Sequence, residues 1–401
     1  MSDCHNGEVS SIDSSALFQA ETLSLLNELS EQSSLDDLVG TVSKLRAAGH
    51  PQERIHHAIE QVRLRRKAVP KFAEFAKSML FTEAGLEQAT RLSVAAHHAG
   101  RFQTAGLKSV ADLGCGIGGD SMAFAALGLD VLSVEADPLT AAVANFNVAS
   151  FDNAKVENTT LESIDLSLVE SAWLDPARRD GVTRLTNPDD WSPSLDVAFE
   201  IARTLPSGVK LAPGMDRGLI PDDMEAQWVS AGGDVVEMVL WSSALKTEGV
   251  TRSALIIGPT SSHTLSAPGD TEDVEVGELG EFLYEPDGAI IRARLIGDVA
   301  RSLGGRMIDS SIAYFSADSH QPTPFATAFA VEEVLSPKPK DLAKWVRANQ
   351  VGTLEIKKRG FDVDPASLRK QLPLSGPASK TLFLTRISGK KVAIAATRVS
   401  N

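Results

Sequence analysis

Residues 112–121 read DLGCGIGGDS, in which Gly114, Gly116, Gly118 and Gly119 fall within six consecutive positions. The stretch follows the apolar run KSVADLG and leads into GGDSMAFAALG, whose apolar spacing is helical. A strand, a glycine-rich turn and a helix in this order are typical of the nucleotide-binding edge of a doubly wound fold. Glycines permit the tight turn and let a ligand approach the backbone. The stretch therefore predicts a ligand site at the turn.

The alternation of strand and helix continues along the chain. Further strands are predicted at 129–137, 154–160, 171–180 and 208–213, and helices at 138–151 and 194–205. Strands that alternate with helices indicate an α/β fold with a parallel, doubly wound sheet. The runs DVVEMVLWSS (234–243) and TRSALIIG (251–258) follow without an intervening helix and predict a closing antiparallel pair.

The flanking regions have different patterns. Residues 12–105 carry helical spacing, with a break predicted at Pro70, and the polar stretch 260–280 reads as a linker or loop. The segment 289–305 reads as helical, and the tail mixes two helices with three strands, which indicates a small α+β module. The predicted parts are an N-terminal helical domain (1–105), a core (106–260), a linker (261–280) and a C-terminal α+β region (281–401).

Charge is unevenly distributed. The chain has a formal net charge of −14, yet residues 331–401 hold 14 Lys and Arg against 6 Asp and Glu, a net of +8. Such asymmetry indicates either a module for an anionic partner, with RNA as the candidate, or a solvated basic face. The same two interpretations apply to the basic run Arg63, Arg65, Arg66 and Lys67.

Composition excludes several classes. No apolar run approaches the roughly 20 residues of a membrane helix, and the N-terminus MSDCHNGEVS lacks the features of a signal peptide. Two cysteines argue against a disulfide framework and suit a cytoplasmic location. No Cys/His cluster has metal-ligand spacing, so no metal is expected; the pairs His56-His57 and His97-His98 read as surface or packing residues.

Acidic residues beside the turn narrow the ligand. An acid at the end of the next strand can bind ribose hydroxyls, and Glu135 has this place, with Asp137 as the alternative. Gly114, Gly116 and Gly119 also match the bare dinucleotide pattern G-x-G-x-x-G. Asp112, however, would repel a pyrophosphate and suits a cationic ligand such as S-adenosylmethionine.

The string D-x-G-x-G-x-G-G-D closely resembles motif I of the class I S-adenosylmethionine-dependent methyltransferases, and VEADP resembles their motif II. The resemblance implies a Rossmann-like, seven-stranded core. It implies that Gly114, Gly116 and Gly118 line the methionine part of the cofactor, that Asp112 holds its ammonium group and that Glu135 holds its ribose. The other residues that it places at the cofactor are Cys115, which need not react, Asp120, Ser121, Ala136, Asp137, Thr160 and Leu161 beside adenine, and Pro176.

The fourth strand ends in LDPARRD. Many amino-directed methyltransferases carry Asn/Asp-Pro-Pro-aromatic at this place, and by that resemblance Asp175 would hold the acceptor and contact the cofactor. The chain keeps Asp175-Pro176 but has Ala177 and Arg178 in place of the stacking aromatic. The guanidinium of Arg178 can stack on a base or bind phosphate, which makes it a second candidate catalytic residue. Salt bridges of Arg178 and Arg179 to local acids are the alternative.

A wider resemblance covers about residues 60–400. The strings KFAEFAKSMLFTEAGLEQAT, WLDPARRD, DDWSPSLD, VKLAPG, LYEPDGAIIRA, TPFATAFAVEE and LEIKKRGFDVDP are similar to a family of bacterial methyltransferases with a C-terminal THUMP-like domain. The core also resembles that of trimethylguanosine synthase relatives, which implies that Phe81 and Thr82 close over the cofactor. A hydrophobic staple explains Phe81 equally well. Lys357, Lys358 and Arg359 suit an RNA backbone.

Together these features favour a methyltransferase that uses S-adenosylmethionine and modifies RNA at a base nitrogen. One alternative is the same enzyme acting on a protein or a small molecule, which the net acidity and the missing aromatic favour. Another is a non-catalytic RNA-binding protein with a vestigial cofactor site. The sequence predicts neither the acceptor nor the oligomeric state.

Overall fold

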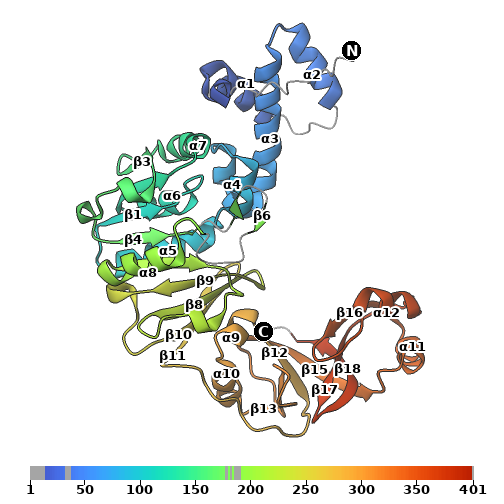
Figure 1. Ribbon diagram of the computed structural model, residues 1–401. Coiled ribbons are helices and arrows are strands. Elements are labelled where there is room, and N and C mark those ends of the chain that lie inside the picture. Colours follow the sequence, from blue (N-terminus) through green and yellow to red (C-terminus); the bar gives the residue numbers. More distant parts are fainter. Residues whose placement is uncertain (1–13, 32–37, 177–178, 181–182, 185–190, 400–401) are drawn as a thin grey trace, which may run out of the picture. The chain divides into compact units, whose positions relative to one another are not determined.

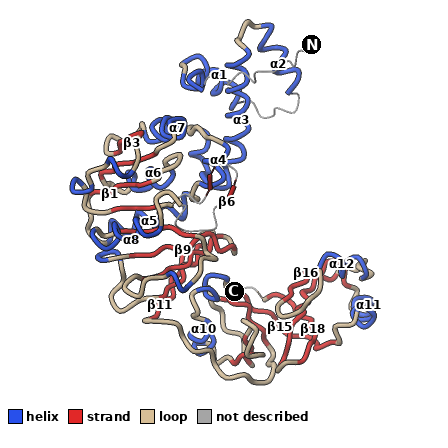
Figure 2. The backbone as a smooth tube through the Cα atoms, viewed as in Figure 1, coloured by secondary structure: helices blue, strands red, loops and turns tan. Residues whose placement is uncertain are grey.

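The computed structural model describes residues 14–31, 38–176, 179–180, 183–184 and 191–399. The chain divides into two compact units, a first unit over Met1–Val209 and a second unit over Lys210–Asn401. Figures 1 and 2 show the helices and strands of each unit. The first unit begins with a helical region, and the second unit is rich in strands.

The N-terminal part of the first unit is helical, as the sequence predicts. Its elements are η1 (Ser14–Phe18), α1 (Ala20–Glu31), α2 (Leu38–Ala47), α3 (Gln52–Phe72), η2 (Ala73–Lys77), α4 (Glu83–Gln88) and α5 (Leu92–Thr104). The break predicted at Pro70 is wrong by two residues, because α3 continues to Phe72 and ends where Ala73 takes φ +48°. Apolar side chains of this region, among them Leu26, Ala58 and Phe72, form one core.

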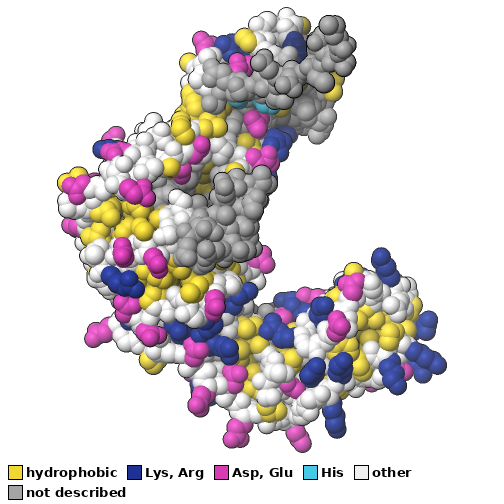
Figure 3. All heavy atoms as spheres, viewed as in Figure 1, with side chains coloured by type: hydrophobic (Ala, Val, Ile, Leu, Met, Phe, Trp, Pro, Cys, Tyr) yellow, Lys and Arg dark blue, Asp and Glu magenta, His cyan; other side chains and the backbone are white. Residues whose placement is uncertain are grey.

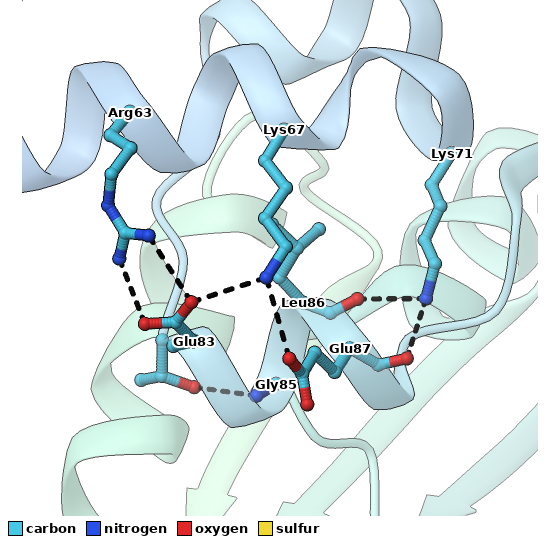
Figure 4. Close-up of polar contacts among 8 residues, drawn as sticks. Arg63, Lys67, Lys71, Glu83, Gly85, Leu86 and Glu87 are labelled. Carbon is cyan, nitrogen blue, oxygen red and sulfur yellow. Dashed lines mark hydrogen bonds and ion pairs between the residues drawn. The ribbon is translucent and has the colours of Figure 1, made fainter.

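The basic run of α3 is used inside the unit (Figure 4). Arg63 donates to both carboxylate oxygens of Glu83 at 3.3 and 2.9 Å, and Lys67 bridges Glu83 and Glu87 at 3.2 and 3.4 Å. Arg65 is buried and donates to the Met79 carbonyl at 2.9 Å, and this burial lowers its pKa to about 10. These three cations therefore stabilise the packing of α3 within the unit. This role favours a structural interpretation of Arg63, Arg65 and Lys67 over phosphate binding.

A nine-stranded sheet carries the predicted site. Its order is β11-β10-β8-β9-β7-β4-β1-β2-β3. The strands are β1 (Ser109–Leu113), β2 (Asp130–Glu135), β3 (Ala154–Asn158), β4 (Ala172–Leu174), β7 (Ser207–Leu211), β8 (Glu225–Ala231), β9 (Asp234–Trp241), β10 (Arg252–Ile257) and β11 (Ser262–Ala267). β1 pairs in parallel with β2 and β4, β2 with β3, and β4 with β7. The predicted doubly wound α/β sheet is confirmed.

Helices connect these parallel strands. They are α6 (Gly119–Ala126), α7 (Pro138–Val148) and α8 (Leu195–Thr204), with short 3-10 turns η3 (Leu161–Ser163) and η4 (Leu166–Leu168) after β3. α7 begins as its sequence predicts, because Asp137 accepts a hydrogen bond from the Thr140 amide at 2.8 Å and Pro138 occupies the first turn. The backbone of β5 (Arg179–Asp180) and β6 (Thr183–Arg184) forms a two-stranded ribbon.

Two predictions at the far edge of the sheet are wrong. β9 and β10 do not pair with each other, because β8 lies between them, antiparallel to β9 and parallel to β10. The expected linker contains a strand, since β11 pairs antiparallel with β10 and extends the sheet beyond seven strands. The turns η6 (Arg217–Leu219) and η7 (Ser243–Leu245) complete this region.

The rest of the second unit is built on a seven-stranded sheet of order β13-β14-β12-β15-β18-β17-β16. Its elements are β12 (Phe282–Pro286), α9 (Gly288–Arg292), α10 (Ile296–Ser302), β13 (Arg306–Met307), β14 (Phe315–Ala317), β15 (Ala326–Leu335), α11 (Pro339–Ala348), β16 (Val351–Lys358), α12 (Pro365–Gln371), β17 (Ala378–Ile387) and β18 (Lys390–Arg398). The predicted helix over 289–305 is two helices, and the α+β tail is confirmed. Leu342, Trp345 and Leu368 of α11 and α12 pack against Leu354 and Leu382.

We predict that Lys71→Met loosens α4. The Lys71 ammonium donates to the Leu86 and Glu87 carbonyls (Figure 4) and to the Ala89 carbonyl, each at 2.8 Å, at the end of a helix where backbone oxygens lack partners. Loss of this cap costs about 1–2 kcal/mol locally. Deuterium uptake of peptides covering residues 83–90 should therefore be about tenfold faster.

The matched control is Lys77→Met. Among the described residues, the one ion pair of Lys77 is with Glu74, at 2.8 Å. The two side chains are 73% and 86% exposed. Such an exposed pair contributes little, so uptake over 83–90 should stay at the wild-type rate. Equal rates in the two variants would refute the capping role of Lys71.

Candidate functional site

The glycine turn between β1 and α6 has a left-handed backbone. Gly114, Gly116 and Gly118 take φ values of +88°, +56° and +83°, a conformation that glycine adopts without the steric cost of a Cβ. The amides of Gly114 and Cys115 both donate to the Val134 carbonyl at 3.0 Å, which fixes the turn to the end of β2. The left-handed backbone of the glycines and these two hydrogen bonds therefore determine the shape of the turn that the sequence predicts.

The three glycines face different surroundings. A Cβ on Gly118 would lie 3.3 Å from Val148, and one on Gly114 would lie 3.3 Å from the Asp175 carbonyl oxygen, so both positions are closely packed. A Cβ on Gly116 would meet no heavy atom within 4 Å. Gly116 thus leaves room beside the turn that a ligand can use.

Asp112 is held by a chain of buried hydroxyls. The Ser121 hydroxyl donates to the Asp112 carboxylate at 2.5 Å, and the Ser133 hydroxyl donates to Ser121 at 2.8 Å. All three side chains are buried, with exposures of 1% or less. A buried carboxylate that accepts such bonds stays fixed at the end of β1, and it provides negative charge beside the turn. Ser121 thereby supports Asp112.

Glu135 closes the turn from the end of β2. Its Oε2 atom accepts the Gly116 amide at 3.1 Å and its Oε1 atom accepts the Asp137 amide at 2.9 Å. Burial raises the pKa of Glu135, and these two amides act in the opposite direction. The Asn158 amide donates to the Glu135 and Ala136 carbonyls at 2.9 and 3.1 Å. A half-buried carboxylate with fixed backbone is suited to hydroxyl groups of a ligand.

The other residues predicted at this edge lie around Glu135. Asp137 is exposed and caps α7, and Ala136 is exposed beside it. Thr160 is exposed at the start of η3, and its neighbour Leu161 is half-buried. These positions leave polar and apolar surface along the ends of β2 and β3.

The predicted acceptor residue lies at the end of β4. The Asp175 amide reaches the Leu113 carbonyl at 3.5 Å, and the Asp175 carbonyl is the atom closest to a Cβ placed on Gly114. Asp175 is half-buried and Pro176 is buried. The structure therefore brings Asp175 next to the glycine turn. Arg178 lies outside the described residues.

Cys115 is buried within the turn. Burial raises the pKa of its thiol well above the usual value, and the nearby charges of Asp112 and Glu135 act in the same direction. The thiol therefore stays protonated at neutral pH, which makes it a poor nucleophile. Its place in the turn is a packing position.

The segment with Phe81 and Thr82 reaches the turn through Ile117. The Asn147 amide of α7 donates to the Leu80 and Ile117 carbonyls at 3.0 and 2.8 Å, which joins this segment to the turn. The Phe81 ring is buried and lies 5.7 Å from the Phe72 ring, so its side chain belongs to the helical core. Thr82 caps α4 by accepting the Gly85 amide at 3.0 Å. The structure supports a packing role for Phe81.

Asp120 has partners away from the turn's open side. Its carboxylate accepts the Thr90 hydroxyl at 2.7 Å and contacts His98 Nδ1 at 2.9 Å. The His98 ring is buried and lies 4.3 Å from the Trp173 ring on β4. These contacts join α6 to α5 and to Thr90 just before α5, which gives Asp120 a structural role; its contact with the cofactor stays a prediction.

Several residues of this arrangement were not predicted. Ser133, Asn147 and Asn158 act through hydrogen bonds to groups distant in sequence. Ser133 and Asn147 are polar residues within largely apolar runs, whereas Asn158 stands among other polar residues. Within the described residues, no three His, Cys, Asp or Glu side chains are arranged to hold a metal ion. None of the described helices is long and apolar enough to cross a membrane.

Comparisons with known proteins agree with this geometry. Two S-adenosylmethionine-dependent methyltransferases from two strains of Mycobacterium tuberculosis, both described as uncharacterized, are 31% identical over 337 residues, which are 82% of this chain and 92% of each relative. Residues 326–398 match the model of the family described as THUMP domain-like.

A solved structure extends the likeness to the whole fold. The crystal structure of a candidate methyltransferase from Porphyromonas gingivalis superposes with a TM-score of 0.72 at 20% identity, covering 95% of this chain and 98% of that one. The predicted fold class, a methyltransferase core with a helical N-terminal region and a C-terminal THUMP-like domain, is confirmed. The similarity to trimethylguanosine synthase relatives stays a prediction.

We predict that His98→Ala lowers the free energy of unfolding by about 3 kcal/mol. The substitution removes the contact between the buried Asp120 carboxylate and His98 and opens a cavity beside Trp173. Urea unfolding followed by tryptophan fluorescence measures the change. The control is His97→Ala, because the neighbouring His97 is only half-buried and should lose less than about 1 kcal/mol. Similar losses in both variants would contradict the role of His98.

Proposed function

The chain belongs to the family of S-adenosylmethionine-dependent methyltransferases, and from this premise we propose that it methylates a base nitrogen of RNA. The observation that carries the proposal is the THUMP-like domain, in which residues 331–401 have a net charge of +8 in a chain whose net charge is −14. Polyanions bind through such local excess of Lys and Arg. We also propose a cytoplasmic location, which the presence of two cysteines in 401 residues supports.

We assign the cofactor to the glycine turn. The open space at Gly116 and the exposed backbone at Gly114 fit a ligand that lies against the turn. The fixed carboxylates suit its two polar ends, with Asp112 for the ammonium group and Glu135 for the ribose hydroxyls. Thr160 and Leu161 are assigned to the adenine. Among the remaining predicted residues, Ser121 and Cys115 support the turn through their own contacts, and Thr82 caps α4.

We assign the acceptor to Asp175. When bound, S-adenosylmethionine supplies a methyl group on a positively charged sulfur, which leaves as a neutral thioether with the electrons of the broken S–CH3 bond. The carboxylate of Asp175 can accept a hydrogen bond from the acceptor nitrogen, align its lone pair and take the proton that it releases. Pro176 stiffens the chain behind it. Arg178 stays a sequence-based candidate for positioning the nucleic acid.

The surface of the C-terminal domain supports RNA as the acceptor. Figure 3 shows many Lys and Arg side chains over the part of the second unit that carries α11 and α12. The exposed cations of residues 331–399 that make no ion pair with a described residue are Lys338, Lys340, Lys344, Arg347, Lys358, Arg369, Lys370, Lys390 and Lys391. Their charges are available to phosphate groups.

The motif LEIKKRG contributes less than its charge suggests. Lys357 is paired with Glu285 at 2.6 Å and with Glu355 at 3.4 Å, and the Arg359 guanidinium lies 5.1 Å from the centre of the Tyr314 ring. Of the three predicted cations, Lys358 is the exposed one. We therefore give Lys358 and the cations of α11 and α12 the larger part in RNA binding.

A protein or small-molecule acceptor is the second candidate. The net charge of −14 and the absence of an aromatic residue after Asp175-Pro176 favour it, because base methylation by related motifs uses that ring for stacking. Experiments that compare methyl transfer to RNA with transfer to other acceptors distinguish these two candidates.

We predict that Gly116→Arg abolishes binding of S-adenosylmethionine in calorimetry while the chain stays folded. The new side chain enters the open space assigned to the cofactor. The control is Gly128→Arg, because Gly128 also has a positive φ, +84°, and no heavy atom within 4 Å of an added Cβ. Both variants carry the same backbone cost of about 1–2 kcal/mol. Tight binding by Gly116→Arg would overturn the assigned site.

We predict that Asp175→Ala reduces methyl transfer at least about 100-fold and leaves cofactor affinity within about twofold. Mass spectrometry of nucleosides identifies the acceptor in a strain that lacks the gene. A modified base should disappear there, return with the wild-type chain and stay absent with Asp175→Ala. If RNA from the strain that lacks the gene is unchanged while a protein or small molecule has lost its methyl group, RNA is rejected as the acceptor. Normal turnover by Asp175→Ala would reject the role of Asp175.

A further inference from the structure

A cluster of four arginines lies in the second unit, outside the predicted site. Arg217 begins η6, Arg252 begins β10, Arg292 ends α9, and Arg294 follows two residues later. α9 packs against β8, β9 and β10, which brings these separate segments together (Figure 1). The sequence shows only the pair Arg292 and Arg294, within AIIRARLIG.

Hydrogen bonds fix the inner arginines. Arg217 forms an ion pair with Asp270 and donates to the Arg292 carbonyl at 2.5 Å. Its guanidinium lies 5.2 Å from the centre of the Trp228 ring. Arg252 Nε lies 3.0 Å from the same Asp270 oxygen. An ordered guanidinium loses less conformational entropy when it binds a further ligand.

Of the outer arginines, Arg292 is fixed through its side chain and Arg294 through its backbone. Arg292 donates to the Pro213 carbonyl at 3.0 Å, the same oxygen that accepts the Trp228 indole N–H at 3.1 Å. Arg294 has a left-handed backbone, φ +60°, and its carbonyl accepts both the amide and the hydroxyl of Thr271 at 3.0 Å. Such strain persists where surrounding contacts impose it. Arg294 is exposed and forms no ion pair within the described part of the chain.

Positive charge is in excess here. The cluster combines four guanidinium groups with one ion-paired carboxylate, Asp270; the neighbouring Asp216 caps its own turn at the Gly218 amide. Burial lowers the pKa of Arg217, and Arg252 and Arg294 also lower it against the attraction of Asp270. Arginines that repel one another in a folded chain are stabilised by a bound anion.

We propose that Arg217, Arg252, Arg292 and Arg294 form a binding site for the phosphate groups of an RNA strand. The site is separate from the lysine-rich surface of α11 and α12, and it rests on the proposed function for the identity of its ligand. The planar fork of each guanidinium matches two phosphate oxygens, and the guanidinium of Arg217 lies against the Trp228 ring. The contact carries no base specificity, so its part is to hold the strand.

The test compares two double variants of the full chain. In the first, Arg292→Ala and Arg294→Ala remove the two outer guanidinium groups. In the control, Lys108→Ala and Arg203→Ala remove two exposed cations of the first unit, of which Lys108 directly precedes β1 and Arg203 lies in the last turn of α8. Binding of a fluorescein-labelled, mixed-sequence, single-stranded RNA of about 20 nucleotides is measured between about 50 and 300 mM NaCl.

We expect the first variant to bind this RNA about tenfold more weakly, with a salt slope that is smaller by about 1.4 for two lost contacts. The control should match the wild-type chain. Equal affinities and slopes in the two double variants would overturn the site while leaving the proposed function intact. The single variant Arg294→Glu repeats the test if the double variant unfolds, since the Arg294 side chain has no ion-pair partner to lose among the described residues.

A second probe separates failure of the site from failure of the proposed function. If the wild-type chain binds no RNA, the proposed function fails, and calorimetry with inorganic tripolyphosphate then tests the cluster alone. Loss of tripolyphosphate binding in Arg292→Ala/Arg294→Ala, with binding kept in the control, supports a phosphate site. Equal binding by both variants overturns it.

Discussion

Two consecutive residues at the start of α6 anchor the glycine turn on which the site depends. Ser121 donates to Asp112 at the end of β1, and Asp120 accepts hydrogen bonds from Thr90 and His98 of the helical region. The turn itself has a left-handed backbone and little side-chain packing at Gly116. Its geometry therefore depends on these buried polar contacts at its far end, each of which would be costly to leave unpaired.

The helical region is coupled to the turn in the same way. Asn147 of α7 bonds to both Leu80 and Ile117, and Gln61 of α3 exchanges hydrogen bonds with the Phe81 backbone at 2.7 and 3.0 Å. The segment that leads into α4 is thus fixed by amide side chains that satisfy backbone groups. A cofactor site beside this segment gains a rigid wall, because ordering it costs no further entropy when a ligand binds.

Local patterns in the sequence predicted the parallel strands, the glycine turn and the α+β tail, but partner-dependent features were out of reach. β8 was missed because Glu225, Gln227 and Ser230 look like surface residues. They are buried, since Ser253, Trp241 and Asp287 provide their hydrogen bonds from distant segments. The sequence predicts a linker at the edge strand β11 because residues 260–280 are polar, acidic and rich in Ser and Gly, and the strand itself is mostly exposed. The partners of Asp120 are likewise distant in sequence, so the sequence could place Asp120 in the turn but could not show which side its carboxylate faces.

Charge in this chain is divided between structural pairs and unpaired cations. On α3, Arg63 and Lys67 are matched by Glu83 and Glu87, so their positive charge is consumed in packing. Around Arg217 a single carboxylate serves two arginines while two more remain beside them. Bringing like charges together costs free energy, so such a cluster persists only where another interaction offsets that cost. The two basic clusters therefore differ in their acidic partners. The number of Lys and Arg residues in a stretch of sequence does not show this difference.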